Sequence, residues 1–173
     1  VLLGSVSPSG KTPITWPRTL GQIPIFYSQR NSGRPENPAD RFTSKYLDVQ
    51  NSPLIPFGFG LTYGRFVYGN LRVTPATVTA GDSIEIAVDV TNEGARAAEE
   101  TVFLFIRDPV ASIARPTLEL KGVTKIALDP GETGTARLRL AAAELGLLGI
   151  DFEPVLEPGE IEIRVGPSAD TAQ

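Results

Sequence analysis

The feature that most constrains the fold is a series of short segments after residue 64 in which apolar and polar residues alternate. The clearest of them spans residues 84–90, and its apolar positions are Ile84, Ile86, Val88 and Val90. The same period recurs in residues 136–140 and 161–165. A period of two places every second side chain on one face, which is typical of a strand with one buried face.

Turn-forming sequences rich in Gly, Asp, Asn and Pro separate these segments, at residues 80–82, 92–94, 129–132 and 157–160. About seven strands in roughly 100 residues, with turns every 8–12 residues, are typical of an antiparallel sandwich. We therefore predict a mainly β fold, an antiparallel β-sandwich of immunoglobulin or fibronectin type III architecture.

Three local features of this region carry further predictions. A change of phase at Gly69 predicts a bulge in the first strand. Gly122 divides residues 118–128 into two short apolar stretches, and residues 141–148 can form one helical turn over the end of the sandwich.

Residues 101–107 are apolar on both faces. Val102, Leu104 and Ile106 face one way, whereas Phe103 and Phe105 face the other. The outer face of a sandwich strand is normally polar. We expect the two Phe side chains to be covered, either by another domain or chain or by a loop of the same domain.

Residues 1–63 have a different character, because they are rich in Pro, Ser and Asn and show little periodicity. Residues 28–55 nevertheless contain Phe42 and Tyr46, so we predict an ordered excursion that lies against a partner surface. In residues 56–63 (PFGFGLTY), large apolar side chains alternate with glycines that let the backbone bend tightly. This stretch is interpreted as a structural joint between packed surfaces.

Composition excludes several classes of function. The chain has no Cys and no His, which excludes disulfides, Ser-His-Asp and Cys-His catalysis and the commonest metal ligands. Its net charge of −4 does not favour nucleic-acid binding, and no apolar run is long enough to span a bilayer. We expect no metal, no cofactor, no nucleic-acid partner and no membrane partner.

Paired carboxylates are the remaining catalytic signal, since glycoside hydrolysis uses two of them across a sugar ring. The pairs closest in sequence are Glu99 with Glu100, Asp151 with Glu153, and Glu157 with Glu160. All are expected to be solvated, at turns or on polar strand faces. We predict no catalytic residue in this chain.

Several strings resemble the C-terminal end of family 3 glycoside hydrolases, the β-glucosidase and β-xylosidase group. In chain order they are PSGKTPITWPR (8–18), GQIPIFY (21–27), SGRP (32–35), TSKYLD (43–48), PFGFGLTY (56–63), RPTLELKG (115–122), LDPGET (128–133), EPG (157–159) and VGPS (165–168). The sequence departs from the family pattern at Val123, Ile161 and residues 147–149, where aromatic residues are usual. These departures affect packing positions.

The resemblance implies an enzyme with three parts. A catalytic barrel supplies an Asp nucleophile, an α/β-sandwich domain commonly supplies a Glu acid/base, and a fibronectin type III-like domain follows. It assigns residues 1–28 to the tail of the α/β-sandwich domain, 29–67 to an extended linker and 68–173 to the fibronectin-like domain. Because the chain begins Val-Leu-Leu-Gly without Met, we expect a fragment or processed piece of a longer polypeptide.

This assignment leads to expectations about sites and partners. Interdomain packing is expected of Phe57, Phe59, Tyr63, Phe103 and Phe105. In the excursion, Arg34 and Tyr46 are candidates for lining a sugar site, although anchoring the excursion to its neighbour is an alternative role. The expected partners are the barrel and α/β-sandwich domains of the same enzyme and an oligosaccharide substrate. The family resemblance favours a periplasmic or secreted location.

Two other interpretations of the chain remain open at this point. It could be a non-catalytic module that binds polysaccharide through exposed aromatic side chains. The sandwich offers Phe103, Phe105 and Phe152 for this purpose and contains no Trp beyond residue 71. Alternatively, its aromatic side chains could mediate contacts in a homodimer.

Overall fold

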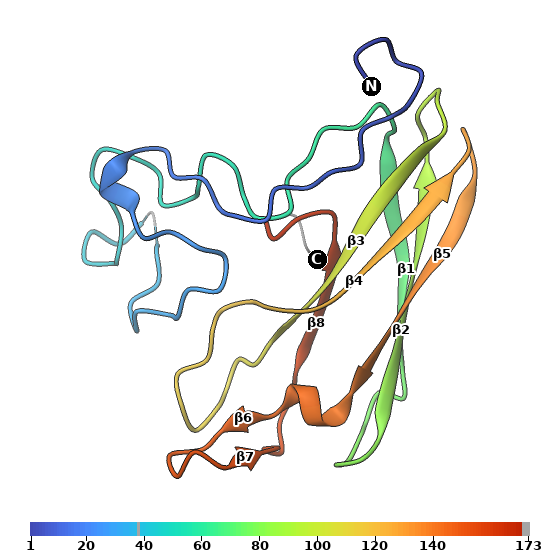
Figure 1. Cartoon of the computed structure of the whole chain (residues 1–173). Helices are drawn as coiled ribbons and strands as arrows, with labels where there is room; N and C mark the ends of the chain where they lie inside the picture. Colours follow the sequence, from blue (N-terminus) through green and yellow to red (C-terminus); the bar gives the residue numbers. More distant parts are fainter. Residues whose placement is uncertain (38, 171–173) are drawn as a thin grey trace.

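The computed structural model describes residues 1–37 and 39–170 and contains a two-layer β-sandwich (Figure 1). Residues 171–173 of the predicted fibronectin-like domain lie outside the described residues. The first sheet has the order β1-β2-β5 and comprises β1 (Phe66–Thr74), β2 (Ser83–Asn92) and β5 (Thr133–Ala141). The second has the order β4-β3-β8 and comprises β4 (Glu119–Leu128), β3 (Ala98–Arg107) and β8 (Glu162–Gly166). All pairings within the two sheets are antiparallel.

The core lies between the two sheets and is built from the alternating positions seen in the sequence. The buried side chains that form it include Ile86 and Val90 of β2, Leu140 of β5, and Val102, Leu104 and Ile106 of β3. Burying one such side chain stabilises the fold by about 1.5–3 kcal/mol relative to leaving it exposed. The predicted division of β3 into two faces is confirmed, because Phe103 and Phe105 belong to a second apolar cluster.

Two strands carry irregularities that the sequence partly predicted. The β1–β2 register shifts between Gly69 and Arg72, which confirms the bulge predicted at Gly69. The two apolar stretches predicted on either side of Gly122 belong to one strand, because β4 continues through Gly122. A register shift in the β3–β4 pairing absorbs the irregularity, and a Cβ atom at Gly122 would lie 2.7 Å from Leu138 Cδ2. Glycine therefore lets the two sheets approach closely here.

The outer face of the first sheet is polar and carries a hydrogen-bond network centred on Asp89. Arg72 donates to both carboxylate oxygens of Asp89, at 2.7 and 3.0 Å, and Thr135 and Asn70 donate as well. These donors, Arg72 first, hold the pKa of the Asp89 carboxyl well below its usual range. The network links three neighbouring strands across their solvated face.

The end of the sandwich opposite the N-terminus carries short elements. The predicted helical turn is present as the 3-10 helix η2 (Ala142–Leu145), and a small hairpin of β6 (Leu147–Leu148) and β7 (Pro154–Val155) follows it. Phe152 at the hairpin tip has a φ of 64°, a left-handed conformation that is unfavourable for a bulky side chain. The residue is 82% exposed.

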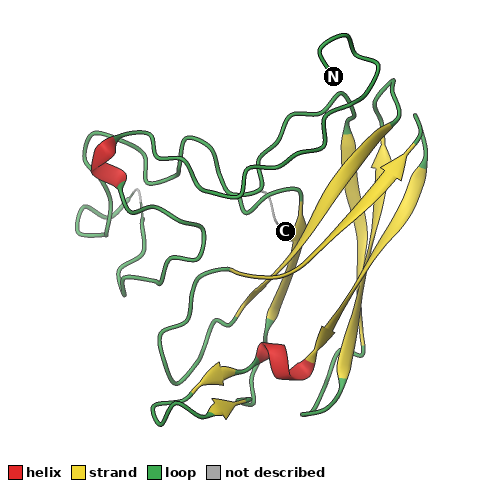
Figure 2. Cartoon of the chain, in the orientation of Figure 1, coloured by secondary structure: helices red, strands yellow, loops and turns green. Residues whose placement is uncertain are grey.

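The N-terminal segment (residues 1–65) contains the single short helix η1 (Leu20–Gln22) and otherwise irregular structure within the described residues (Figure 2). Two of its stretches run side by side away from the sandwich toward a lobe (residues 17–37 and 39–54) at the left of Figure 1. Backbone hydrogen bonds from Trp16 to Ile55 and from Leu54 to Trp16, at 2.8 and 2.9 Å, join them. In the described part of the chain, no helix has both the length and the apolar character needed to cross a membrane.

Candidate functional site: the joint between the N-terminal segment and the sandwich

The joint is centred on four aromatic rings contributed by both parts of the chain. Phe103 and Phe105 lie on the outer face of β3, and Tyr27 and Phe57 of the N-terminal segment cover them. The ring centroids are 4.6 Å apart for Tyr27–Phe57, 5.6 Å for Phe57–Phe103 and 5.8 Å for Tyr27–Phe105. Tilted and edge-to-face pairs at these distances are favourable beyond their burial alone. The apolar outer face predicted for β3 is therefore covered by residues of this chain that lie outside the sandwich.

This burial also bears on the polysaccharide-binding interpretation. A sugar-binding face needs exposed aromatic rings, and both Phe103 and Phe105 are buried. Of the three Phe residues that the sandwich offered, only Phe152 is exposed. The described part of the sandwich thus presents no aromatic platform.

Backbone contacts fix the position of residues 57 and 58 over the sheet. The N–H of Ala169 donates to the carbonyl of Phe57 at 2.9 Å. Gly58 has a φ of +82°, and a Cβ atom there would lie 3.0 Å from both the Phe103 ring and Cα of Ser168. Both the left-handed backbone and the close approach require glycine at this position.

An ion pair lies next to the aromatic cluster. Lys11 Nζ is 2.8 Å from a carboxylate oxygen of Glu100, and the side chains are 12% and 4% exposed. The prediction that Glu100 is solvated is therefore wrong: the alternation of β3 places its side chain on the core-facing side with Val102 and Leu104, where Lys11 reaches it. The neighbouring residue Thr12 exchanges backbone hydrogen bonds with Gly58 and Phe59, at 2.9 and 2.8 Å.

The remaining predicted packing residues lie at the upper part of the joint. The Tyr63 hydroxyl donates to the carbonyl of Val1 at 3.0 Å, and the Arg96 guanidinium stacks over the Tyr63 ring at 5.7 Å. Arg96 also donates to the carbonyl of Gly4 at 2.6 Å. Phe59 and Tyr63 both remain 42% exposed. These two rings therefore face solvent as well as the joint.

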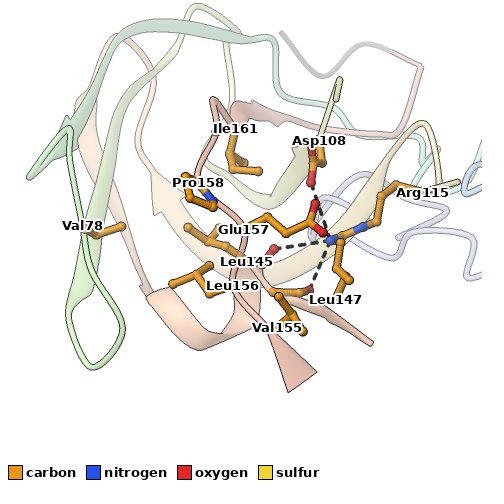
Figure 3. Close-up of a pocket in the computed structure, with 12 residues that line it drawn as sticks. Val78, Asp108, Arg115, Leu145, Leu147, Val155, Leu156, Glu157, Pro158 and Ile161 are labelled. Atoms are coloured by element: carbon orange, nitrogen blue, oxygen red, sulfur yellow. Dashed lines mark hydrogen bonds and ion pairs between the residues drawn. The ribbon is translucent and has the colours of Figure 1, made fainter. Parts of the chain in front are cut away.

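A second polar site, missed in the sequence, surrounds Arg115 at the far end of the sandwich (Figure 3). The buried guanidinium binds Glu119 at 2.6 Å, lies 3.7 Å from Asp108, and donates to the carbonyls of Leu145 and Gly146. The pocket beside it holds about 100 Å³, whereas ligand pockets typically measure about 300–1,000 Å³. Arg115 therefore ties a loop to η2 and leaves no room for a sugar. The spacing of four residues between Arg115 and Glu119 is no sequence signal for this contact, because it brings side chains together on a helix and neither residue lies in one.

Two of the carboxylates from the predicted pairs, Glu99 and Glu157, are engaged in structural contacts. Glu99 binds Lys125 at 2.6 Å and accepts from Ser9, and these bonds lower its pKa. Glu157 accepts from Ser112, which lowers its pKa in the same way. No group of three or more potential metal ligands is found in residues 1–37 and 39–170.

Comparison with known proteins gives the joint its context. Residues 100–169 match the family described as "Fibronectin type III-like domain". Over 96% of its length the chain is 38% identical to a periplasmic β-glucosidase of Salmonella typhimurium, and over 98% it is 38% identical to a β-xylosidase of Formosa agariphila. A crystal structure of a β-glucosidase from Listeria innocua in complex with gluconolactone superposes on 99% of the chain with a TM-score of 0.93 and 35% identity. The chain belongs to glycoside hydrolase family 3.

Within family 3, the chain matches the C-terminal part of longer proteins. It spans 22% of the Salmonella relative, 23% of the Formosa relative and 24% of the Listeria structure. The predicted fibronectin type III-like fold is confirmed. Both the sandwich and the N-terminal segment fall within the match, so the joint is part of the shared structure.

The two residues of the excursion that were predicted to line a sugar site, Arg34 and Tyr46, border different depressions. The Tyr46 hydroxyl donates to the carbonyl of Gly21 at 3.3 Å, and its ring lines a shallow depression with Gln22 and Lys45. Arg34 lines a different depression. The structure brings neither residue into a closed pocket, and their role stays a prediction.

Proposed function

We propose that this chain is the C-terminal portion of a retaining β-glucosidase-like hydrolase and that its own role is structural. The observation that supports this most strongly is its end-to-end similarity to β-glucosidases, which includes the irregular N-terminal segment as well as the sandwich. Retaining glycosidases use one carboxylate as nucleophile and a second as acid and then base. On this proposal both carboxylates lie in the rest of the enzyme.

The exposed side chains of the N-terminal segment support a bracing role. Large apolar residues that are more than two-thirds exposed include Leu2, Leu3, Leu20, Phe42, Leu47 and Leu61. Such a concentration of exposed apolar side chains marks a surface that another protein part covers. On this proposal the preceding catalytic domains rest on this segment, and the aromatic joint fixes the sandwich to it.

We propose the domain division predicted from the sequence, with residues 1–28 as a domain tail, 29–67 as a linker and 68–173 as the fibronectin-like domain. The first strand of the sandwich begins at Phe66, close to the proposed boundary. Within the linker, Arg34 and Tyr46 would line the approach to an oligosaccharide bound by the catalytic domains. The name of the periplasmic relative favours a periplasmic or secreted enzyme.

The experiment compares the full-length protein with the 173-residue chain on an aryl β-glucoside. We expect turnover with retention of anomeric configuration by the full-length protein, followed by NMR, and no turnover above background by the chain alone. Turnover by the isolated chain would refute the structural role. Inactivity of the full-length protein on β-glucosides and β-xylosides would refute the proposed reaction.

The contribution of the linker is tested separately in the full-length protein. Tyr46→Phe and Arg34→Gln should raise KM for oligosaccharides more than for the aryl glucoside, because only longer substrates would reach the lobe. Asp48→Asn is the control, because Asp48 is exposed in the same segment and lines neither depression. Equal kinetics of all three variants and the wild type would refute the substrate-lining role.

A further inference from the structure

The lobe meets the sandwich through contacts of two different kinds. Tyr27 packs its ring against Phe57 and Phe105 in the aromatic joint. Two residues later, the carbonyl of Gln29 accepts one bond from the N–H of Thr117 at 2.8 Å and another from the Thr117 hydroxyl at 2.9 Å. Apolar contact is not directional, whereas a hydrogen bond constrains the angle at which two groups meet. The Thr117 bonds therefore fix the direction in which the chain leaves the joint.

Thr117 belongs to the β3–β4 loop (residues 108–118), and Arg115 holds this loop from the inside. The Arg115 guanidinium donates through Nε and Nη2 to one carboxylate oxygen of Glu119, at 2.9 and 2.6 Å. Its Nη1 lies 3.7 Å from Asp108 and donates to the carbonyls of residues 145 and 146 (Figure 3). The Arg115 side chain is only 6% exposed. Both ends of the loop and the base of the hairpin are therefore bound to one buried guanidinium.

The residues held by this loop stand at one base of a larger loop in the lobe. Beside the hydrogen bonds just described, Arg30 and Pro116 form an isolated β-bridge. A second isolated bridge joins Trp16 and Ile55. Residues 31–54, which include Tyr46, lie between these two fixed points. One base of this loop is thus held within the N-terminal segment, and the other is held by the sandwich.

The base held by the sandwich also forms part of the depression at Tyr46. Gln29 and Tyr46 border the same depression, which has a volume of about 340 Å³ and is at the lower end of the range for ligand sites. Tyr46 is 43% exposed, so a ligand in the depression can contact it. A shift of Gln29 would therefore move one wall of the depression relative to the wall at Tyr46.

We propose that Arg115 and Thr117 are positioning residues for the oligosaccharide substrate of the parent hydrolase. Arg115 holds the β3–β4 loop, Thr117 holds Gln29, and Gln29 fixes the depression in which a sugar unit contacts Tyr46. The inference rests on the proposed substrate-lining role of Tyr46. It adds a function for the sandwich, which contributes to the affinity for long substrates without touching the bond that is cleaved.

Steady-state kinetics of the full-length protein test the proposal with a β-linked trisaccharide and an aryl β-glucoside. Thr117→Val removes one of the two bonds to Gln29 and should raise KM for the trisaccharide about threefold. Arg115→Lys keeps the charge but loses the fork of donors, and should raise this KM about tenfold. The kcat for the trisaccharide and both constants for the aryl glucoside should stay unchanged in each variant.

Two control variants separate positioning from a general loss of stability. Thr91→Val makes the same change as Thr117→Val in the Thr91–Thr133 hydroxyl pair of the first sheet. Val90→Ala opens a cavity at a fully buried position of the main core. Neither control should change KM for either substrate, and an equal rise in Val90→Ala would overturn the proposal. Unchanged trisaccharide KM values in Thr117→Val and Arg115→Lys would also overturn it if Tyr46→Phe raises that KM.

Amide hydrogen exchange in the full-length protein decides the remaining case, in which Tyr46→Phe has no kinetic effect and the substrate-lining role fails. The N–H groups of Ser44 and Tyr46 donate hydrogen bonds within the lobe, at 3.0 and 2.9 Å. In Thr117→Val and Arg115→Lys both amides should exchange about threefold faster than in the wild type, because one base of their loop is loosened. Exchange rates equal to those of the wild type would overturn the positioning of the lobe by the sandwich.

Discussion

The ion pair between Lys11 and Glu100 provides the sharpest test of how the N-terminal segment is held. Both side chains are largely buried, at 12% and 4% exposure. Removing one partner of a buried pair typically costs about 3–5 kcal/mol, because the other charge stays buried without compensation. Lys11 keeps some contact with water, so we expect Lys11→Met to lower the free energy of unfolding by about 3 kcal/mol. The double variant Lys11→Met/Glu100→Gln carries no buried charge and should recover most of that loss.

Urea unfolding at pH 7 can be followed by two probes that report on different parts of the chain. Trp16 is the single tryptophan, lies five residues from Lys11, and donates from its indole N–H to Thr12. Its fluorescence therefore reports on the N-terminal segment, whereas far-ultraviolet circular dichroism reports on the strands. In the wild type the two transitions should coincide, and in Lys11→Met the fluorescence transition should occur at lower urea.

The control is Lys125→Met, which removes the partner of Glu99. This pair is about half exposed on both sides, so its loss should have a much smaller effect than the loss of Lys11. The reasoning fails if the two single variants lose equal stability. It also fails if the double variant is as unstable as the sum of Lys11→Met and Glu100→Gln, because the two residues would then not be coupled.

The other predictions concern packing, pH and backbone conformation. Phe105→Ala should cost about 3–5 kcal/mol in urea unfolding because it empties a buried site, and no loss beyond 1 kcal/mol would contradict the aromatic joint. Phe152→Gly should instead raise stability by about 1 kcal/mol, because glycine relieves the left-handed backbone; a loss would mean that the exposed ring makes stabilising contacts. The pKa of Asp89 is lower in the folded state than in the unfolded state, where it is about 3.9. The ionised Asp89 carboxylate therefore stabilises the fold fully above this unfolded pKa, and its contribution is lost as the pH falls through the lower pKa of the folded state. The wild type should therefore lose more stability than Asp89→Asn between pH 5 and pH 2, and parallel pH profiles would exclude this network. Gly58→Ala should lower the melting temperature more than Gly33→Ala. Both glycines have a positive φ, but of the two only Gly58 would place its new Cβ atom against neighbouring atoms. Equal decreases in melting temperature would mean that backbone strain alone, and not close packing at Gly58, causes the loss.

Much of the sandwich could be predicted because the residue pattern of each strand reflects which of its faces is buried. In β2 and β5, one face is buried and the other is solvated, so the alternation in the sequence identifies both the strand and its orientation. The same logic separated Leu104 from Phe105 in β3. The alternation did not predict that β4 is one continuous strand, because β4 stays paired with β3 through a register shift that the sequence of β4 alone does not show.

The joint was harder to predict because its partners are remote in the chain. The alternation of β3 places Glu100 on the side of Val102 and Leu104, but only Lys11, which is remote in the sequence, makes the burial of its carboxylate acceptable. Likewise, the buried Arg115 donates hydrogen bonds to the backbone carbonyls of residues 145 and 146. The sequence does not show which backbone carbonyls are free to accept such bonds. The resemblance to family 3 could predict that the aromatic residues pack, but not which ring covers which.

The bridges of Arg30 with Pro116 and of Ile55 with Trp16 make residues 31–54 a loop whose two ends are fixed at its base. The entropy of closing such a loop grows slowly, so doubling its length costs only about 0.6 kcal/mol. Insertions or deletions within this loop therefore leave the joint and the sandwich almost unaffected. The loop is consequently the part of this chain most open to evolutionary change in length, and a suitable point at which to graft a new recognition loop onto the scaffold.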